Sequence, residues 1–401
     1  MPPSDDRACL PVPLEELQRR WVAVRSAMRE RQLDALVVQN SNDWLGGYVR
    51  WLTGSPATNA YPRSLVFPLE GLMSTVGQGA FDSVLEPNGA DPAFPGVGRQ
   101  LHTPSYVSAA GTAGYDAELV LGEVSRLGCR RVAMVAPAAM YFGFGTRLAE
   151  GLRSAGIAAS DATAFVDDLK AIKSPYEQQR IAATAAMQDE VLRQVCRFIR
   201  PGLREFEVAA YAQYIGQTLG SEQGIFIGSS AGPGQPAMFR PRSQQGRTLS
   251  RGDTLTLLIE NNGPGGYYTE LLRPIFLGRA AAEHRDAWAL LLEAQRFTLD
   301  RLKPGAACRE IFAEYNAWLR ARGQGEERRL HCHGQGYDMV ERPLVRHDES
   351  MSLHPGMNIV VHPACKSPGV FMTVVDNYLI GPAGPGECLH HSPKTLIELD
   401  L

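Results

Sequence analysis

The chain has 401 residues, of which 44% are hydrophobic and 21% are charged, and its 40 basic and 43 acidic side chains give a formal net charge of −3. This composition is typical of a globular protein with a sizeable core, and at roughly 100 to 200 residues per domain it predicts two or three domains. The balanced charge gives no electrostatic support to a nucleic-acid or anionic-membrane partner, so we expect neither.

The first residues, MPPSDDRACLPVPLEELQRR, contain neither a basic leader followed by an apolar stretch nor an Arg-rich amphipathic pattern. No apolar run approaches the roughly 18 residues that a membrane-spanning helix needs. The seven cysteines are scattered and never spaced as CxxC, which indicates neither a disulfide framework nor a cysteine zinc site. We therefore expect a cytoplasmic protein with reduced thiols.

Residues 1–164 alternate helical and strand-like patterns. Apolar residues at helical spacing predict helices, and short apolar runs predict strands. The predicted elements are helices over residues 14–31, 117–127 and 147–155 and strands over residues 33–38, 64–67 and 131–135. Helices that alternate with strands indicate an α/β domain, which we expect to end near residue 164.

A second domain is predicted over residues 165–401. It opens with a strand or turn from Val166, followed by Ser174 as helix N-cap, Pro175 at the first helical position and Glu177 at the capping-box position of a long helix. Further helices are predicted over residues 205–219, 284–302 and 309–322, and strands over residues 253–260, 267–277, 357–362 and 373–380. These paired strands indicate an α+β layer structure with an antiparallel sheet.

Four polar residues lie on these predicted strands or beside glycine turns: Glu270, His333, His362 and Asp376. An Asp inside an apolar strand such as VVDNYLI is costly to bury unless a cation or an imidazole pairs with it. Two imidazoles and two carboxylates would form the ligand set of one Zn, Fe, Mn or Co ion. The residues alone also allow structural roles, in which His362 bonds a backbone carbonyl, Asp376 caps a turn and Glu270 pairs with Arg273.

The glycines of GPGG, residues 263–266, are expected to form a tight turn between paired strands. They are not a phosphate loop, because neither GxGxxG nor GxxxxGK[ST] occurs there between a strand and a helix. No nucleotide cofactor is predicted.

The segments GDTLTLLIENNGPGGYYTELLRPIFLG, HGQGYDMVERP, LHPGMNIVVHP and VVDNYLI occur in this order along the second half. In these segments the chain resembles the creatinase, prolidase and methionine aminopeptidase superfamily, and the resemblance covers nearly the whole chain. It implies a C-terminal catalytic domain with the pita-bread fold, preceded by a creatinase-type α/β domain.

Metal-dependent members of this superfamily hold two ions with two Asp, one His and two Glu. Carried over by position, the first Asp falls on Ile259 and the second on Glu270, while the His, the first Glu and the second Glu fall on His333, His362 and Asp376. Since the first Asp binds only the second ion, the resemblance implies a mononuclear site at the other four positions. Glu260, next to Ile259, is the alternative residue for the lost position.

Two histidines that serve peptide hydrolysis in the family are replaced here. Met238 or Phe239 stands at the first of these positions and Val340 at the second. Their loss removes proton donors and oxyanion stabilisers for amide cleavage, so the resemblance favours a non-peptide substrate.

Arg63 in YPRSLVF matches the carboxylate-binding arginine of creatinase, a metal-free member of the superfamily. A guanidinium fork binds a carboxylate through two hydrogen bonds. In creatinase-like dimers this arginine reaches the neighbouring subunit's pocket, so the resemblance implies a homodimer with the active site near the subunit interface. The catalytic Glu of creatinase is replaced by Leu272.

We therefore predict a hydrolase that cleaves a carbon–nitrogen bond in a small, carboxylate-bearing, non-peptide substrate. One divalent metal would be held by the four residues above, Glu341 would transfer the proton, and Arg63, Tyr337 and Arg342 would bind the substrate. The alternatives are a metal-free creatinase-like hydrolase or lyase with His333 as acid or base, a non-haem iron oxygenase, an Xaa-Pro peptidase-like enzyme, and a non-catalytic small-molecule-binding protein.

Overall fold

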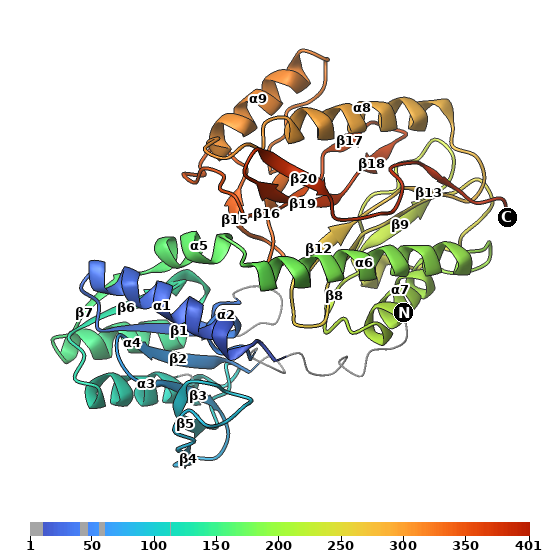
Figure 1. The fold of residues 1–401 in the computed structure, drawn as a ribbon. Coiled ribbons are helices and arrows are strands. Elements are labelled where there is room, and N and C mark those ends of the chain that lie inside the picture. Colours follow the sequence, from blue (N-terminus) through green and yellow to red (C-terminus); the bar gives the residue numbers. More distant parts are fainter. Residues whose placement is uncertain (1–10, 41–46, 56–60, 113) are drawn as a thin grey trace. The chain divides into compact units, whose positions relative to one another are not determined.

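The computed structural model describes all residues except 1–10, 41–46, 56–60 and 113. It divides into two compact units, Pro11–Lys170 and a second unit that contains Ala171–Leu401 (Figure 1). No helix among the described residues combines the length and the apolar character needed to cross a membrane.

The first unit is built around one seven-stranded sheet with the strand order β4-β5-β3-β2-β1-β6-β7. Strands β1, β6 and β7 are parallel to one another, whereas β2 is antiparallel to β1 and β3. The elements are α1 (Leu14–Glu30), β1 (Ala35–Asn40), α2 (Tyr48–Thr53), β2 (Arg63–Pro68), β3 (Met73–Gln78), β4 (Val84–Leu85), β5 (Val97–Thr103), α3 (Tyr115–Arg126), β6 (Arg131–Val135), α4 (Phe142–Ser154), β7 (Ala158–Asp161) and α5 (Thr163–Ala171). The α/β architecture expected for this part is confirmed.

The second unit contains four sheets, whose strand orders are β21-β13-β10-β9, β12-β11-β8, β15-β14-β16-β19-β20 and β17-β18. Its first elements are α6 (Pro175–Phe198), α7 (Glu205–Thr218), β8 (Gly224–Ile225), β9 (Gly228–Ala231), β10 (Thr254–Leu257), β11 (Ile259–Asn262), β12 (Tyr268–Leu271), β13 (Ile275–Phe276), α8 (Ala282–Leu299) and α9 (Cys308–Arg320). The remaining strands are β14 (Cys332–Gly334), β15 (Glu341–Leu344), β16 (Asn358–Val361), β17 (Ala364–Lys366), β18 (Phe371–Thr373), β19 (Asp376–Gly381), β20 (Gly384–Cys388) and β21 (Ile397–Glu398).

Helices cover both sides of the strands in this unit. Helix α6 packs on β11 and β12, and α8 packs on β16, β17 and β18, so that the sheets lie between them (Figure 1). The strand predicted over residues 253–260 is divided into β10 and β11, and the strand predicted over residues 267–277 is divided into β12 and β13. The division arises because β10 and β13 pair in one sheet while β11 and β12 pair in another. The predicted antiparallel pairing itself is confirmed.

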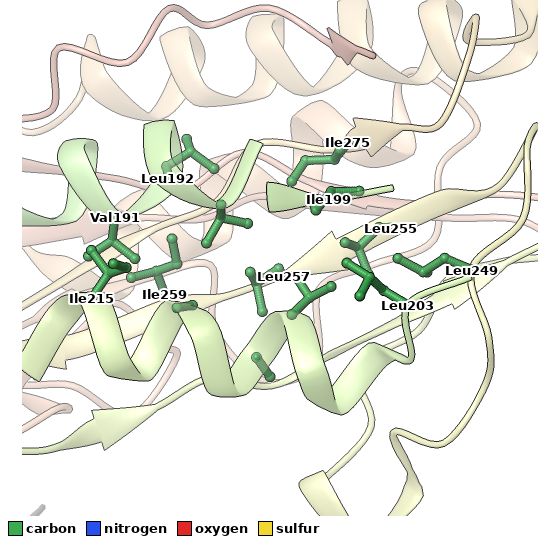
Figure 2. Close-up of a cluster of buried hydrophobic side chains, with 14 of the residues drawn as sticks. Val191, Leu192, Ile199, Leu203, Ile215, Leu249, Leu255, Leu257, Ile259 and Ile275 are labelled. Atoms are coloured by element: carbon green, nitrogen blue, oxygen red, sulfur yellow. The ribbon is translucent and has the colours of Figure 1, made fainter. Parts of the chain in front are cut away.

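A buried apolar cluster joins α6 and α7 to the β10–β13 strands (Figure 2). Ile259 and Leu271, which are cross-strand partners, both lie in this cluster. Since successive side chains of a strand point to opposite faces, the neighbouring residues Glu260 and Glu270 face away from the helices. This alternation decides which residues of the β11–β12 hairpin reach the candidate site.

Helix α6 begins as its sequence predicted. Ser174 is the N-cap and forms a capping box with Glu177, and Pro175 occupies the first helical position. The segment before it was predicted wrongly: residues 163–171 form helix α5 and not a strand or turn. Two apolar residues of this segment, Phe165 and Val166, are adjacent in the chain and buried, and an adjacent apolar pair fits a short helix as well as a strand.

Substitution of Ser174 by Ala is expected to destabilise the protein by about 1 kcal/mol, because the Glu177 backbone N–H loses its 3.2 Å bond to the serine hydroxyl. Urea unfolding followed by circular dichroism measures this change. Ser154→Ala, at the exposed end of α4, is the control and should change the free energy of unfolding by less than about 0.5 kcal/mol. Equal effects of both variants would contradict the capping role.

Candidate metal and catalytic site

Two carboxylates face each other on the β11–β12 hairpin. Glu260 and Glu270 are direct cross-strand partners, and both are buried. Side chains in such pairs lie about 5 Å apart at Cβ, and like charges there repel each other. A cation bound beside the two carboxylates, or a proton on one of them, would relieve this repulsion.

Two imidazoles complete the cluster. His333 lies on β14 and His362 directly follows β16. Ligand atoms of Glu270, His333 and His362 all lie within 4.8 Å of one another, and the two rings are 5.1 Å apart at their centroids. Three residues that are distant in the sequence therefore converge on one point.

The hydrogen bonding of His333 fixes which nitrogen faces that point. Its Nδ1 lies 2.9 Å from the carbonyl oxygen of Gly334, so we assign the proton to Nδ1, which donates to this carbonyl. The unprotonated Nε2 then lies 3.9 Å from Oε2 of Glu270. A lone pair and a carboxylate oxygen that face each other at this distance fit a divalent metal, and a backbone carbonyl on the other nitrogen is the usual support of a metal-binding histidine.

The protonation states of the cluster follow from burial. Burial lowers the pKa of His333 to about 4, and burial together with His333 lowers the pKa of His362 well below its usual value. Burial raises the pKa of Glu270 to about 8, and burial together with Glu270 raises that of Glu260. Both imidazoles are therefore neutral near pH 7, as metal binding requires, and a bound dication would favour the deprotonated carboxylates.

Buried amides hold the two strand systems together at the site. The backbone N–H of Glu270 donates to Oδ1 of Asn377 at 2.8 Å. The amide nitrogen of Asn377 donates to Gln335 at 2.8 Å, and Gln335 in turn donates to Oε1 of Glu260 at 3.1 Å. The network orients Glu260 and ties β12 to β19, which is how a site assembled from several strands keeps its geometry.

The model of one protein family, metallopeptidase family M24, matches residues 179–382, which is half of the chain and includes the whole cluster. The chain belongs to the metallopeptidase family M24. This confirms the resemblance inferred from the motifs, and it makes the protein a hydrolase of this superfamily.

Similar proteins agree with the M24 assignment. The chain is 24% identical over 239 residues to an uncharacterized peptidase, YqhT, of Bacillus subtilis, which covers 58% of this chain and 66% of that protein. It is 26% identical over 208 residues to an Xaa-Pro dipeptidase of Pyrococcus furiosus, covering 51% of this chain and 58% of the dipeptidase. These two alignments thus span less than two thirds of the relatives' lengths.

The solved structure of an Xaa-Pro dipeptidase from Bacillus anthracis superposes with a TM-score of 0.75 over 96% of this chain and 100% of that one, at 19% identity. The likeness confirms the fold, a pita-bread domain within a mixed α/β chain.

Asp376 does not join the M24 site, contrary to the prediction. Its carboxylate pairs with Arg273 at 2.6 Å, and it also lies within 3.3 Å of Lys394 and 3.7 Å of His390. Asp376 is the cross-strand partner of Val361, whereas Asn377 is the partner of Val360, so the two residues point to opposite faces of β19. Glu270, His333 and His362 are the three predicted ligands that the structure brings together.

Glu341 and Arg342 are held by neighbours that the sequence did not identify. Glu341 forms a buried ion pair with Lys173, just before α6, so that its charge is already neutralised. Arg342 donates through Nε to Glu349 at 3.1 Å. Both residues therefore have structural partners, and the predicted proton transfer by Glu341 and substrate binding by Arg342 are not supported by their contacts.

Tyr337 and Arg63 lie in different units. Tyr337 is buried with its ring stacked on Tyr267 at 4.2 Å, in the same loop region as the site. Arg63 lies in the first unit with its guanidinium 4.8 Å from the ring of Phe94, beside a cavity of about 370 Å³ that is also lined by Gln100 and His102. Burial lowers the pKa of Arg63. Its predicted role toward the substrate stays a prediction.

Two further charged residues belong to this region. Glu260 occupies the site-facing position that the resemblance had assigned to Ile259, whose side chain lies in the helix-facing core (Figure 2). Arg329, four residues before His333, is exposed, and its charge offsets part of the rise that burial causes in the pKa of Glu270 and of Glu260. Among the described residues, no hydrogen bond or ion pair of the Arg329 guanidinium is formed. The alternation of side chains along the strand LLIEN could have identified Glu260 as facing the site. No pattern in the sequence pointed to Arg329.

Proposed function

We propose that the protein is a metal-dependent hydrolase that cleaves an amide carbon–nitrogen bond in a small, carboxylate-bearing substrate of about dipeptide size. The observation that carries the proposal is the convergence of His333 Nε2, His362 and Glu270 on one point in a hydrolase family of metallopeptidases. When bound, one divalent transition metal would supply a water of lowered pKa or polarise the scissile carbonyl. Glu270, His333 and His362 would hold it.

The remaining side chains suggest how this chain handles the substrate. Glu260, fixed by Gln335 beside Glu270, would take the proton of the attacking water at its free carboxylate oxygen, in place of the neutralised Glu341. The exposed guanidinium of Arg329 would bind the substrate carboxylate through its paired N–H groups. The peptide-like bond is favoured because a relative is named Xaa-Pro dipeptidase, although the family's two proton-handling histidines are replaced.

The test is metal analysis of the protein purified without added metal or chelator, followed by assays with Xaa-Pro dipeptides and N-acyl amino acids. We expect about one equivalent of a transition metal per chain and hydrolysis that a chelator stops. Arg329→Gln should raise KM about tenfold for a carboxylate substrate and leave KM for its carboxamide analogue unchanged. Absence of metal, even after incubation with Zn, Fe, Mn and Co, would contradict the proposal.

One observation favours a second candidate. Two histidines and one carboxylate are also the ligand set of non-haem iron oxygenases. Oxygen consumption that requires ferrous iron and a carboxylate-bearing substrate would support this reading, and hydrolysis under anaerobic conditions would exclude it. The homodimer with Arg63 near the active site remains a further prediction, which mass determination in solution would test.

A further inference from the structure

A cavity of about 370 Å³ lies within the first unit. The ten described residues that line it fall between Tyr61 and His102, so none of them belongs to the candidate metal site. We propose that this cavity binds a small aromatic carboxylate that also carries a hydroxyl group. Such a ligand would be held within one unit, independently of the proposed function and of the role toward a neighbouring subunit that the resemblance implies for Arg63.

The floor of the cavity is formed by three neighbouring strands, β2, β3 and β5. Gly77 on β3 is the direct partner of His102 on β5. Arg63 begins β2 and directly precedes the partner of Val76, so it stands beside Gly77 on the other side. Since neighbouring strands lie about 4.8 Å apart, roughly 10 Å separate the backbones of Arg63 and His102, with only a glycine between them. Val76 points to the opposite face of the sheet, where it packs in the apolar cluster with helix α3.

Gly77 leaves the middle of this row open. A Cβ atom at this position would meet no heavy atom within 4 Å outside its chain neighbours. The φ angle of Gly77 lies outside the left-handed region, so the backbone conformation does not require a glycine here. A glycine inside a strand marks a place where a ligand can approach the backbone closely.

One side of the cavity carries a permanent positive charge. The guanidinium of Arg63 lies over the ring of Phe94, 4.8 Å from its centroid. This stacking occupies the face of the guanidinium and not its N–H edge, which is the edge that binds a carboxylate through two hydrogen bonds. Burial lowers the pKa of Arg63, and a bound anion would offset that cost of burial. None of the described residues that line the cavity is acidic, so the lining favours an anion over a cation.

The opposite side of the cavity offers hydrogen-bond acceptors. Nδ1 of His102 lies 3.3 Å from the carbonyl oxygen of Ser83, so we assign the proton of the neutral ring to Nδ1 and make Nε2 an acceptor. Gln100 donates through its amide nitrogen to Asp91 at 3.2 Å, and its amide oxygen is a second acceptor. A ligand hydroxyl is a donor that suits both groups.

Aromatic rings complete the lining. Tyr61 and Phe94 both line the cavity, and their rings offer apolar contact to an aromatic ligand. A benzene ring that carries a carboxylate and a hydroxyl on opposite sides matches the row that runs from Arg63 to His102. The cavity volume lies within the range of small-molecule sites and exceeds what a single inorganic ion needs.

Titration with 4-hydroxybenzoate tests the cavity, because this probe carries both polar groups on one ring. We expect saturable binding of one equivalent per chain with a dissociation constant below about 5 mM, measured by calorimetry and by ligand-observed NMR. The neutral analogue 4-hydroxybenzamide should bind about tenfold more weakly, since it lacks the charge that Arg63 recognises. Absence of saturable binding below about 5 mM, or equal affinity for the two probes, would overturn the proposal.

Two variants locate the ligand. Gly77→Leu fills the open middle of the row and should weaken binding of 4-hydroxybenzoate at least about tenfold. Arg63→Gln should weaken it about tenfold and leave the affinity for 4-hydroxybenzamide unchanged. Gly122→Leu, at an exposed position of α3 where an added Cβ also meets no atom within 4 Å, is the matched control and should keep full affinity. Full affinity in Gly77→Leu, or an equal loss in the control, would show that the ligand does not occupy the cavity.

The metal-site variant His333→Ala separates this cavity from the proposed function. It should bind 4-hydroxybenzoate as tightly as the wild-type protein, because no described residue of the cavity belongs to the metal cluster. Loss of binding in His333→Ala would place the probe at the metal cluster and overturn the cavity site while leaving the proposed hydrolase intact. A protein that contains no metal but still binds the probe at the cavity would contradict the proposed hydrolase alone.

Discussion

Substitution of His333 by Ala is expected to abolish metal binding at micromolar metal and to reduce the hydrolysis rate by roughly 10³-fold or more. Nδ1 of His333 donates to a backbone carbonyl, so that the unprotonated Nε2 faces Glu270 at 3.9 Å, and the ring is buried. Since loss of a supporting partner alone costs about 10- to 100-fold in metal affinity, loss of the ligand should cost at least the upper value. Metal analysis after dialysis measures the change.

His331→Phe provides the matched control for this prediction. His331 is also fully buried, but its ring stacks on Tyr315 at a centroid distance of 3.6 Å, outside the metal cluster. Burial lowers its pKa to about 3, so the ring is neutral and phenylalanine preserves both its charge and its shape. The control should keep about one equivalent of metal. Equal metal loss in both variants would indicate general disruption of β14 and not removal of a ligand.

Local sequence patterns were sufficient for the features that depend on neighbours in the chain. The capping box of Ser174 and Glu177 lies within one helical turn, and its prediction is confirmed. Glu270, His333 and His362 were selected because they are polar residues on predicted strands or beside glycine turns, and because the family resemblance assigns metal ligands to their positions. The structure does bring these three residues together.

The remaining site residues depended on facts that the sequence does not contain. Asp376 satisfies the same rule as Glu270, but its charge is neutralised by Arg273, 103 positions earlier. The register of β19 decides which of Asp376 and Asn377 faces the metal cluster, and a difference of one residue exchanges them. Glu341 likewise pairs with Lys173, 168 positions away. Only the three-dimensional structure shows which buried carboxylates are paired with a basic side chain of the protein and which remain able to bind a metal ion.

Arg273→Met is expected to destabilise the protein by about 3 to 5 kcal/mol, because it leaves the carboxylate of Asp376 buried without its main cation. The guanidinium is completely buried and also donates to the carbonyl oxygens of Leu272, Val375, Ser392 and Pro393. Urea unfolding measures the loss. The double variant with Asp376→Leu should recover part of it, since no charge then remains in the apolar surroundings.

The pH dependence of this loss identifies its cause. Burial alone would raise the pKa of Asp376, but Arg273, Lys394 and His390 outweigh burial and lower it below 3.8. In the wild-type protein, the stabilisation from Asp376 is therefore present above about pH 4 and is lost as the pH falls through the lowered pKa.

In Arg273→Met burial dominates and the folded-state pKa of Asp376 rises above its unfolded value, so the ionised carboxylate destabilises the fold increasingly as the pH rises from about 4 to 7. The stability difference between wild type and variant should accordingly be larger at pH 7 than at pH 4. Arg346→Met, which removes an exposed pair with Asp348, should cost less than about 1 kcal/mol at either pH. A difference for Arg273→Met that is equal at both pH values would assign the loss to the backbone hydrogen bonds and not to the buried charge.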